Sequence, residues 1–145
     1  MEEYRLRTMA APRQARRLSK TAVCLLRQYL SDEELLYELD LALCEACFNV
    51  AVHAYPGGSR GDVEITVRVE PDDFVELRVA DWGRGLNWEQ ACFENPGEGA
   101  ECGRGLFILR QLADKLDYGS ADGMNQVVMR KKIGGTSWKN TESTG

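Results

Sequence analysis

Apolar and polar residues alternate along two neighbouring stretches in the middle of the chain. In DVEITVRVE, residues 62–70, every second side chain is Val or Ile and the others are polar or charged. FVELRVAD, residues 74–81, continues the alternation after the turn sequence PDD. This pattern is typical of strands with one buried face and one face in water. Because a short turn joins them, the two stretches predict a β-hairpin.

Two further stretches have the pattern of strands, one near each end of the chain. YRLRT, residues 4–8, alternates and predicts a first strand at the edge of a sheet. QVVMRKK, residues 126–132, follows the turn sequence DGMN and predicts a last strand.

Between the first strand and the hairpin, apolar residues recur with a helical period. Pro12 can begin a helix, where its missing N–H costs nothing, and a 3.6-residue period then fits Ala15, Leu18, Ala22, Leu25, Leu26 and Tyr29. Ser31 and Glu34 form a capping-box signature. It predicts a second helix that runs to about Tyr55, where PGG stops it. One face of this helix carries Leu39, Leu43, Ala46, Val50 and Ala54.

The last third of the chain begins with a glycine-rich stretch. Residues 83–105 hold six glycines, with a short helix expected at NWEQACF. GLFILRQLADKL, residues 105–116, predicts a third helix with one apolar side: Leu106, Leu109, Leu112, Ala113 and Leu116. The order β-α-α-β-β-loop-α-β favours an α/β two-layer sandwich, with helices on one face of a mixed, mostly antiparallel sheet. Residues 1–133 are expected to form this domain, and residues 134–145 a disordered polar tail.

Composition limits the classes of protein that the chain can belong to. A length of 145 residues, 43% apolar and 28% charged, is ordinary for one globular domain. The net charge of −5 argues against nucleic acid as the main partner, although residues 1–20 hold six Lys or Arg against two Glu. No apolar run approaches about 18 residues and the N-terminus lacks an apolar signal segment, so neither a membrane span nor secretion is expected.

The five cysteines are an odd number and lie mostly within apolar patterns. This usage is typical of reduced thiols in the cytoplasm. CEAC, residues 44–47, has C-x-x-C spacing, but it lies inside a predicted helix, and the chain holds only one histidine. Core packing is therefore favoured over a zinc or redox site.

The second predicted helix carries three polar residues spaced four apart, Glu45, Asn49 and His53. Such residues are neighbours on one helix face. Taken alone, a polar line facing water is the simpler interpretation. However, the helix is almost free of other charges from Leu39 onward and its flanks are apolar, which indicates burial. A buried carboxylate needs a partner or a function.

Two glycine-containing turns could meet a ligand. Asp81 ends a predicted strand, where its carboxylate can accept a hydrogen bond from a ligand amino group, and Gly83 and Gly85 allow the backbone close to a planar ring. Gly103 and Gly105 lead into the third helix, whose free N–H groups and dipole favour phosphate. Each turn alone is common in proteins and identifies no function.

The order of these motifs is more specific than any one of them. Neither a P-loop nor G-x-G-x-x-G is present, since Trp88 and Ile108 occupy the required last glycine positions. An acid–amide helix, a strand ending in D-x-G-x-G, a long loop and G-x-G at a helix start resemble, in this order, the GHKL (histidine-kinase-like) ATPase superfamily. Within it, EACFNVAVHAY and GRGLFILRQLADKL resemble the motifs of bacterial anti-sigma factor serine kinases. The resemblance covers residues 4–132.

The resemblance implies an ATP site with Mg²⁺ as cofactor. Glu45 matches the general base, Asn49 the residue that holds Mg²⁺, and Asp81 the adenine-binding aspartate. Residues 86–102 would form the ATP lid. The implied ATP-binding residues are Asn49, His53, Asp81, Gly83, Gly85, Leu86, Gly103, Arg104, Gly105 and Leu106.

Three points of the implied site stay open. His53 either contacts the residues that bind the phosphates or is a core histidine, and the core position is favoured. Arg84 and Arg104 are both available for the γ-phosphate, with Arg104 preferred because it lies between two glycines. The family often opens the last strand with Gly-Thr, whereas this chain has Met124 and Asn125, so no contact from that strand is inferred.

The resemblance implies a cytoplasmic ATP-dependent protein serine/threonine kinase that is also an anti-sigma factor. It would phosphorylate an anti-anti-sigma protein, sequester a sigma factor and form a homodimer, without binding nucleic acid or membrane. The alternative is a non-catalytic module that binds ATP and a partner. The ATPase domain of a sensor histidine kinase is disfavoured, because the single histidine lies in the ATP-site helix.

Overall fold

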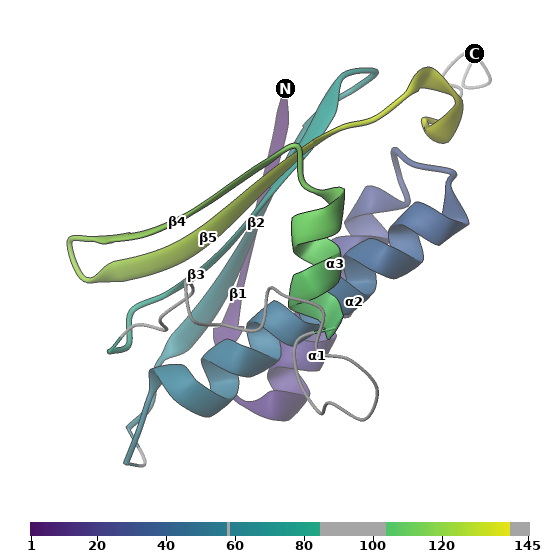
Figure 1. The fold of residues 1–145 in the computed structure, drawn as a ribbon. Coiled ribbons are helices and arrows are strands. Elements are labelled where there is room, and N and C mark those ends of the chain that lie inside the picture. The colour runs from purple at the N-terminus through teal and green to yellow at the C-terminus, as the bar shows by residue number, and fades with distance from the viewer. Residues whose placement is uncertain (58, 85–103, 140–145) are drawn as a thin grey trace.

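In the part of the chain that the structure describes, a five-stranded sheet carries three helices on one face (Figure 1). It is seen in a computed structural model that describes residues 1–57, 59–84 and 104–139, with the backbone alone for residues 104–106. The strands are β1 (Glu2–Met9), β2 (Asp62–Glu70), β3 (Phe74–Asp81), β4 (Lys115–Ala121) and β5 (Met124–Lys132). The helices are α1 (Pro12–Leu26), α2 (Glu33–Asn49) with a π-helical extension η1 (Val50–Ala54), α3 (Arg104–Leu112) and the short 3₁₀ turn η2 (Gly135–Ser137).

The strands lie in the order β1-β2-β3-β5-β4, and all neighbouring pairs are antiparallel. The predicted two-layer α/β sandwich is therefore confirmed, as are the edge position of β1 and the β2–β3 hairpin. The sheet was expected to be mixed, but each of its four described strand pairs is antiparallel. The core lies between the layers, where Val63, Ile65, Val67 and Val69 of β2 are fully buried. They belong to the same hydrophobic core as the predicted apolar side of the α2–η1 helix, whose residues Leu39, Leu43, Ala46, Val50 and Ala54 are at most 1% exposed.

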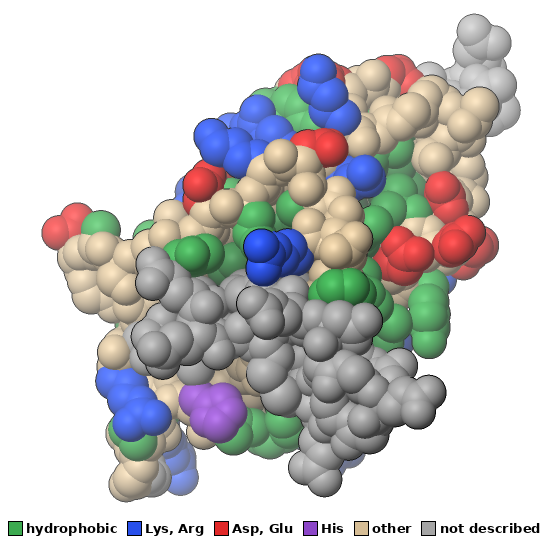
Figure 2. Space-filling model, viewed as in Figure 1, with side chains coloured by type: hydrophobic (Ala, Val, Ile, Leu, Met, Phe, Trp, Pro, Cys, Tyr) green, Lys and Arg blue, Asp and Glu red, His purple; other side chains and the backbone are tan. Residues whose placement is uncertain are grey.

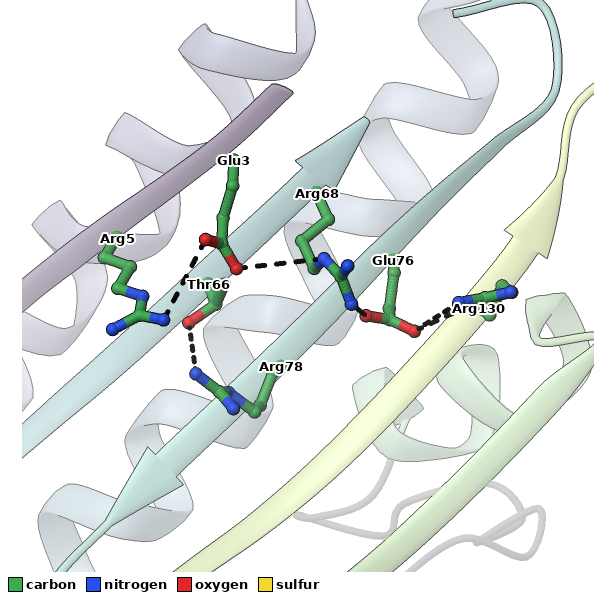
Figure 3. Close-up of polar contacts among 7 residues, drawn as sticks. All are labelled: Glu3, Arg5, Thr66, Arg68, Glu76, Arg78 and Arg130. Atoms are coloured by element: carbon green, nitrogen blue, oxygen red, sulfur yellow. Dashed lines mark hydrogen bonds and ion pairs between the residues drawn. The ribbon is translucent and has the colours of Figure 1, made fainter. Parts of the chain in front are cut away.

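The other face of the sheet carries charged side chains in a connected row (Figure 3). Glu76 of β3 binds two arginines, Arg68 at 2.9 Å and Arg130 at 3.0 Å. Arg68 also lies 3.7 Å from Glu3 of β1. Because antiparallel strands alternate their side chains between faces, this row confirms the predicted wet face of the hairpin.

The start of α2 differs from the predicted capping box by one residue. Asp32 is the N-cap, and its carboxylate accepts a hydrogen bond from the Leu35 N–H at 3.0 Å. Ser31 instead donates its backbone N–H to Ser137 O at 2.9 Å. The prediction that Ser31 caps the helix is therefore wrong, because Ser31 pairs with the C-terminal segment.

The third helix is shorter than predicted, and an unpredicted strand follows it. The α3 helix ends at Leu112, and Leu116 lies in β4, not on the helix. A two-residue turn, Asp122–Gly123 with φ of 55° and 78°, joins β4 to β5. Asp-Gly with positive φ at both residues is the preferred two-residue hairpin turn. The sequence had indicated only a turn there, because β4 is a mostly exposed edge strand without clear alternation.

The segment after Ile133 also differs from the expected disordered tail. Trp138 is only 7% exposed, its indole N–H donates to Ile133 O at 2.8 Å, and it forms a bridge with Leu30. Ser137 donates its hydroxyl to the Asp32 carboxylate at 2.9 Å. Residues 134–139 thus pack beside the start of α2, and residues 140–145 lie outside the described part of the chain.

Two smaller expectations concern cysteines and membranes. Cys24, Cys44 and Cys47 are free, and the burial of Cys47 raises the pKa of its thiol, as expected of a core residue. Within residues 1–57, 59–84 and 104–139, no helix has the length and apolar character needed to cross a bilayer.

Candidate functional site

Three polar side chains form a row across one end of the sheet, on the face covered by the helices. Asp81 of β3 pairs in register with Asn125 of β5, which pairs with Ser120 of β4. Asp81 is fully buried and Asn125 is 6% exposed. The register brings together residues that are about 40 positions apart in the chain, so this row could not be read from the sequence.

The Asp81 carboxylate has one satisfied oxygen and one that is not. Its Oδ1 accepts hydrogen bonds from the Gly83 N–H at 2.9 Å and from Asn125 Nδ2 at 3.0 Å. Its Oδ2 is buried and has no hydrogen-bond partner within the described residues. Leaving a buried acceptor unpaired costs about 1–3 kcal/mol, so such an atom calls for an explanation, and a bound ligand can supply one. The arrangement can therefore bind a ligand that brings an N–H group to Asp81.

Gly83 lies directly against the end of the helix that carries the polar line. A Cβ atom at Gly83 would stand 2.1 Å from the carbonyl oxygen of Ala54, the last residue of η1. The next residue, Arg84, donates its backbone N–H to the same oxygen at 3.0 Å. Only glycine permits this approach, so the turn after β3 and the end of the helix are held together.

Tyr55 also holds the turn after β3 in place, next to the end of the helix. Its hydroxyl donates to the Asp62 carbonyl at 2.5 Å and accepts from the Trp82 N–H at 2.9 Å. Burial raises the pKa of this phenol, so it stays protonated and able to donate. Gly61 makes room for the ring, since a Cβ there would lie 1.9 Å from Tyr55 Cε1. Sequence reasoning missed Tyr55, because only the fold brings residues 62 and 82 beside it.

Glu45, Asn49 and His53 lie along the α2–η1 helix that ends at Ala54. Glu45 and Asn49 are half-buried, and Asn49 is the last residue of α2 before the π-helical turn. Single π turns inside helices occur frequently at functional sites. His53 is exposed, and Figure 2 shows the single histidine at the surface. The slightly favoured interpretation of His53 as a core residue is therefore wrong.

The same helix is not buried all round, as its apolar flanks had suggested. One side of it is exposed to between 37% and 64%, at Tyr37, Leu41, Phe48 and Val52. The α1 and α3 helices and the sheet cover the remaining sides (Figure 1). Glu45 and Asn49 are half-buried, so they lie at the boundary between the core and the surface, where their side chains can meet a ligand.

The remaining predicted residues belong to the segment between β3 and α3. Gly85, Leu86 and Gly103, the expected lid and the expected helix at residues 87–93 all lie outside the described residues. Arg104, Gly105 and Leu106 form the first turn of α3. This helix packs against α2 on the helical side of the sheet (Figure 1). Its first turn therefore lies in the same helical layer as Glu45 and Asn49.

The side-chain oxygens of Asn49 and Glu45 suit a hard cation that also binds water and phosphate oxygens. Among the described residues, no three His, Cys, Asp or Glu side chains gather as a complete metal cage. Asn49 and Glu45 offer oxygen atoms one helical turn apart. Mg²⁺ typically takes one or two protein oxygens and fills its remaining positions with water and phosphate oxygens, so these residues fit Mg²⁺ bound together with a phosphate ligand.

Comparison with known proteins gives consistent matches over most of the chain. A family model described as a histidine kinase-like ATPase domain matches residues 8–131. Relatives named serine-protein kinase RsbW include those of Bacillus pumilus (30% identical; 79% of this chain and 75% of the relative), Bacillus subtilis strain 168 (29%; 82% and 77%) and Listeria innocua (32%; 69% and 68%). In a solved structure of the mycobacterial sensor histidine kinase MprB, the similarity has a TM-score of 0.48 at 18% identity, covering 88% of this chain and 100% of that one.

Proposed function

Because this chain belongs to the histidine kinase-like ATPase family, and within it to the anti-sigma serine-protein kinases, we propose that it is an ATP-dependent protein serine/threonine kinase. Its substrate is a hydroxyl group on an anti-anti-sigma protein. The same chain sequesters a sigma factor when that protein is already phosphorylated. The observation that carries the nucleotide part of this proposal is the unpaired, buried Oδ2 of Asp81.

Asp81 supports recognition of the adenine base. The exocyclic amino group of adenine is a donor that can satisfy Oδ2, while Oδ1 is held by Gly83 and Asn125. Gly83 keeps this corner free of side-chain atoms next to the Ala54 carbonyl. The base therefore gains a hydrogen bond to a charged, desolvated acceptor, which is stronger than a neutral one.

Asn49 and Glu45 support the chemistry at the phosphate end. Asn49 would hold Mg²⁺, which when bound neutralises charge on the phosphate oxygens. Glu45 takes the proton from the acceptor hydroxyl as its oxygen bonds to the γ-phosphorus, and the bond from that phosphorus to the bridging oxygen breaks, so ADP leaves. A general base contributes about 10²–10⁴-fold. Arg104 and the N–H groups at the start of α3 are proposed to bind the γ-phosphate.

The α1 helix supports docking of an acidic partner. A hollow of about 560 Å³ on this helix is lined by Arg13, Arg16, Arg17, Lys20 and Thr21. Lys20 pairs with Asp40, whereas no carboxylate of the described residues lies within 4 Å of the three arginines. We propose that this basic groove contacts the sigma factor or the anti-anti-sigma protein, that the kinase acts as a homodimer, and that it works in the cytoplasm with these partners.

Phosphoryl transfer from labelled ATP to a candidate anti-anti-sigma protein tests the kinase proposal. The wild-type chain is expected to label the protein, and Glu45→Ala to lower the rate by about 10²–10⁴-fold while ATP still binds. Full transfer by Glu45→Ala would overturn the role of Glu45. ATP binding in calorimetry without transfer to any candidate partner would instead favour a non-catalytic binding module.

A further inference from the structure

Asn125 stands at the centre of the polar row that ends at Asp81. Its Nδ2 donates to Asp81 Oδ1 at 3.0 Å and to the Gly83 carbonyl at 3.1 Å. Its Oδ1 accepts from the Ser120 hydroxyl at 2.5 Å. Both amide protons of Asn125 and one of the two lone pairs of its oxygen are therefore used within the protein.

The orientation of the Asn125 amide follows from its neighbours. Two of them, Asp81 Oδ1 and Gly83 O, can only accept, so the NH₂ group must face them. A flipped amide would place its oxygen against both acceptors. Ser120 then supplies the hydroxyl proton to the amide oxygen, which holds the side chain in this orientation from the far side.

Among the described side chains of this polar row, one buried atom has no hydrogen-bond partner at all. Both protons of Asn125 Nδ2 are used, the Gly83 N–H is used by Asp81, and the free atom is the acceptor Asp81 Oδ2. A base that presents a donor there completes the hydrogen bonding. A base that presents a carbonyl oxygen instead places a second acceptor against Asp81 Oδ2, and the two N–H donors of the described residues at this corner, Gly83 N–H and Asn125 Nδ2, are already used.

We propose that Asn125, held by Ser120, is a positioning residue that fixes Asp81 and makes the site selective for 6-aminopurine over 6-oxopurine nucleotides. This inference rests on the proposed function, because it concerns how the same site reads the base. Asn125 acts only through Asp81 and Gly83. Among the described residues, its side chain bonds to Asp81, Gly83 and Ser120 and to none of the proposed phosphate-binding residues, so its removal is expected to affect nucleotide affinity and not the transfer step itself.

The test compares two probes that differ at C6 of the purine, ATP with an amino group and inosine triphosphate with an oxo group, both with Mg²⁺. Calorimetry on the wild-type chain is expected to show that ATP binds roughly 10–100-fold more tightly than inosine triphosphate. Asn125→Ala is expected to weaken ATP binding roughly tenfold and to bring the ratio of the two affinities towards one. In phosphoryl transfer, KM for ATP rises in this variant while kcat is unchanged.

The neighbouring residue offers a matched control. Gln126→Ala removes a carboxamide from the next position of β5, whose side chain points to the opposite face of the sheet, and it should leave the ratio at the wild-type value. Asn125→Thr keeps one donor at this position. Ser120→Ala keeps the Asn125 amide but removes the hydroxyl that holds it. Both variants should therefore give a ratio of ATP to inosine triphosphate affinity between those of the wild type and Asn125→Ala. These milder variants keep the test valid if Asn125→Ala does not fold.

The outcomes separate this inference from the proposed function. An unchanged ratio in Asn125→Ala or in both milder variants, with ATP still bound by the wild type, overturns the role of Asn125 and leaves the kinase proposal intact. Absence of ATP binding by the wild type overturns both. A ratio of the two affinities near one in Asn125→Ala, with unchanged kcat, supports the inference. A loss of stability alone would weaken the binding of both nucleotides equally and leave their ratio unchanged.

Discussion

At the residue scale, the site depends on Asp81 and Tyr55, which differ in how far their hydrogen bonds are made within the described protein. Asp81 is held through Oδ1 and leaves Oδ2 unpaired. Tyr55 does the opposite, because its hydroxyl is fully used in joining the start of β2 to the residue after β3. The first residue can bind a ligand, and the second keeps the backbone around it in place.

Replacing Tyr55 by Phe tests this division. The Asp62 carbonyl and the Trp82 N–H lose their partner, so the free energy of unfolding should fall by about 1–3 kcal/mol. Affinity for ATP should fall as well, since the turn after β3 loses a support. Denaturant unfolding and calorimetry measure the two effects.

Tyr37→Phe is the matched control for this substitution, because Tyr37 is 64% exposed. Tyr37→Phe should leave the free energy of unfolding and the affinity for ATP at their wild-type values. Equal stability of the Tyr55→Phe and Tyr37→Phe variants would show that the junction does not need the hydroxyl.

At the element scale, the ends of the helices determine where the site lies. The α2–η1 helix ends against Gly83, and its start is capped by Asp32 and covered by the segment around Trp138. Contacts at both ends therefore fix the position of Glu45 and Asn49 along the helix axis. A shift of about one residue would move these side chains by 1.5 Å and rotate them by 100°.

The Asp32 cap gives a pH-dependent prediction. The hydrogen bond from the Leu35 N–H, followed by that from Ser137, holds the pKa of Asp32 below its ordinary value. A carboxyl with a depressed pKa stabilises the folded state above its unfolded pKa, near 3.9, and loses that contribution as the pH falls through the folded value. Asp32→Ala should lower the unfolding free energy by about 1 kcal/mol at pH 7.

Unfolding measured at several pH values checks this expectation. The gap between wild type and Asp32→Ala should narrow below about pH 4. Ser31→Ala serves as the control, since Ser31 is beside the cap but does not bond to it. A larger loss in Ser31→Ala than in Asp32→Ala would return the capping role to the residue that the sequence suggested.

At the scale of the whole molecule, charge is distributed unevenly over a chain of net charge −5. On the outer face of the sheet, cations and anions neutralise one another in the row that joins Glu3, Arg68, Glu76 and Arg130 (Figure 3). On α1, the three arginines of the basic groove have no such partners among the described residues. The groove is therefore the surface better suited to an acidic protein.

Charge reversal in the groove tests this assignment. Arg16→Glu combined with Arg17→Glu should weaken binding of a candidate sigma factor roughly tenfold, and the loss should shrink at high salt. ATP affinity should not change. Biolayer interferometry at two salt concentrations measures the effect. Lys115→Glu with Lys132→Glu alters the net charge equally, on β4 and β5, and should bind as the wild type does.

Much of the architecture follows from local patterns. The alternation in residues 62–81 predicted the β2–β3 hairpin, and the helical period after Pro12 predicted α1, because each pattern reflects a single buried face. The β4 strand was missed because an exposed edge strand buries little and carries no alternation. The Ser31 cap failed because a distant segment competes for that residue, which no local pattern can indicate.

The sequence by itself determined the layers, through the order of its elements, and the apolar face of the α2–η1 helix, since spacing along one element fixes which side chains share a face. It also predicted the candidates Glu45, Asn49 and Asp81, through the order of their motifs and the family resemblance. Only the tertiary structure decided that Asn125 and Ser120 complete the row at Asp81, and that Tyr55 and Ala54 hold the turn beside it. Strand register and helix docking bring these residues together. Both are set by the packing of the whole core, so they are not encoded in any short stretch of the chain.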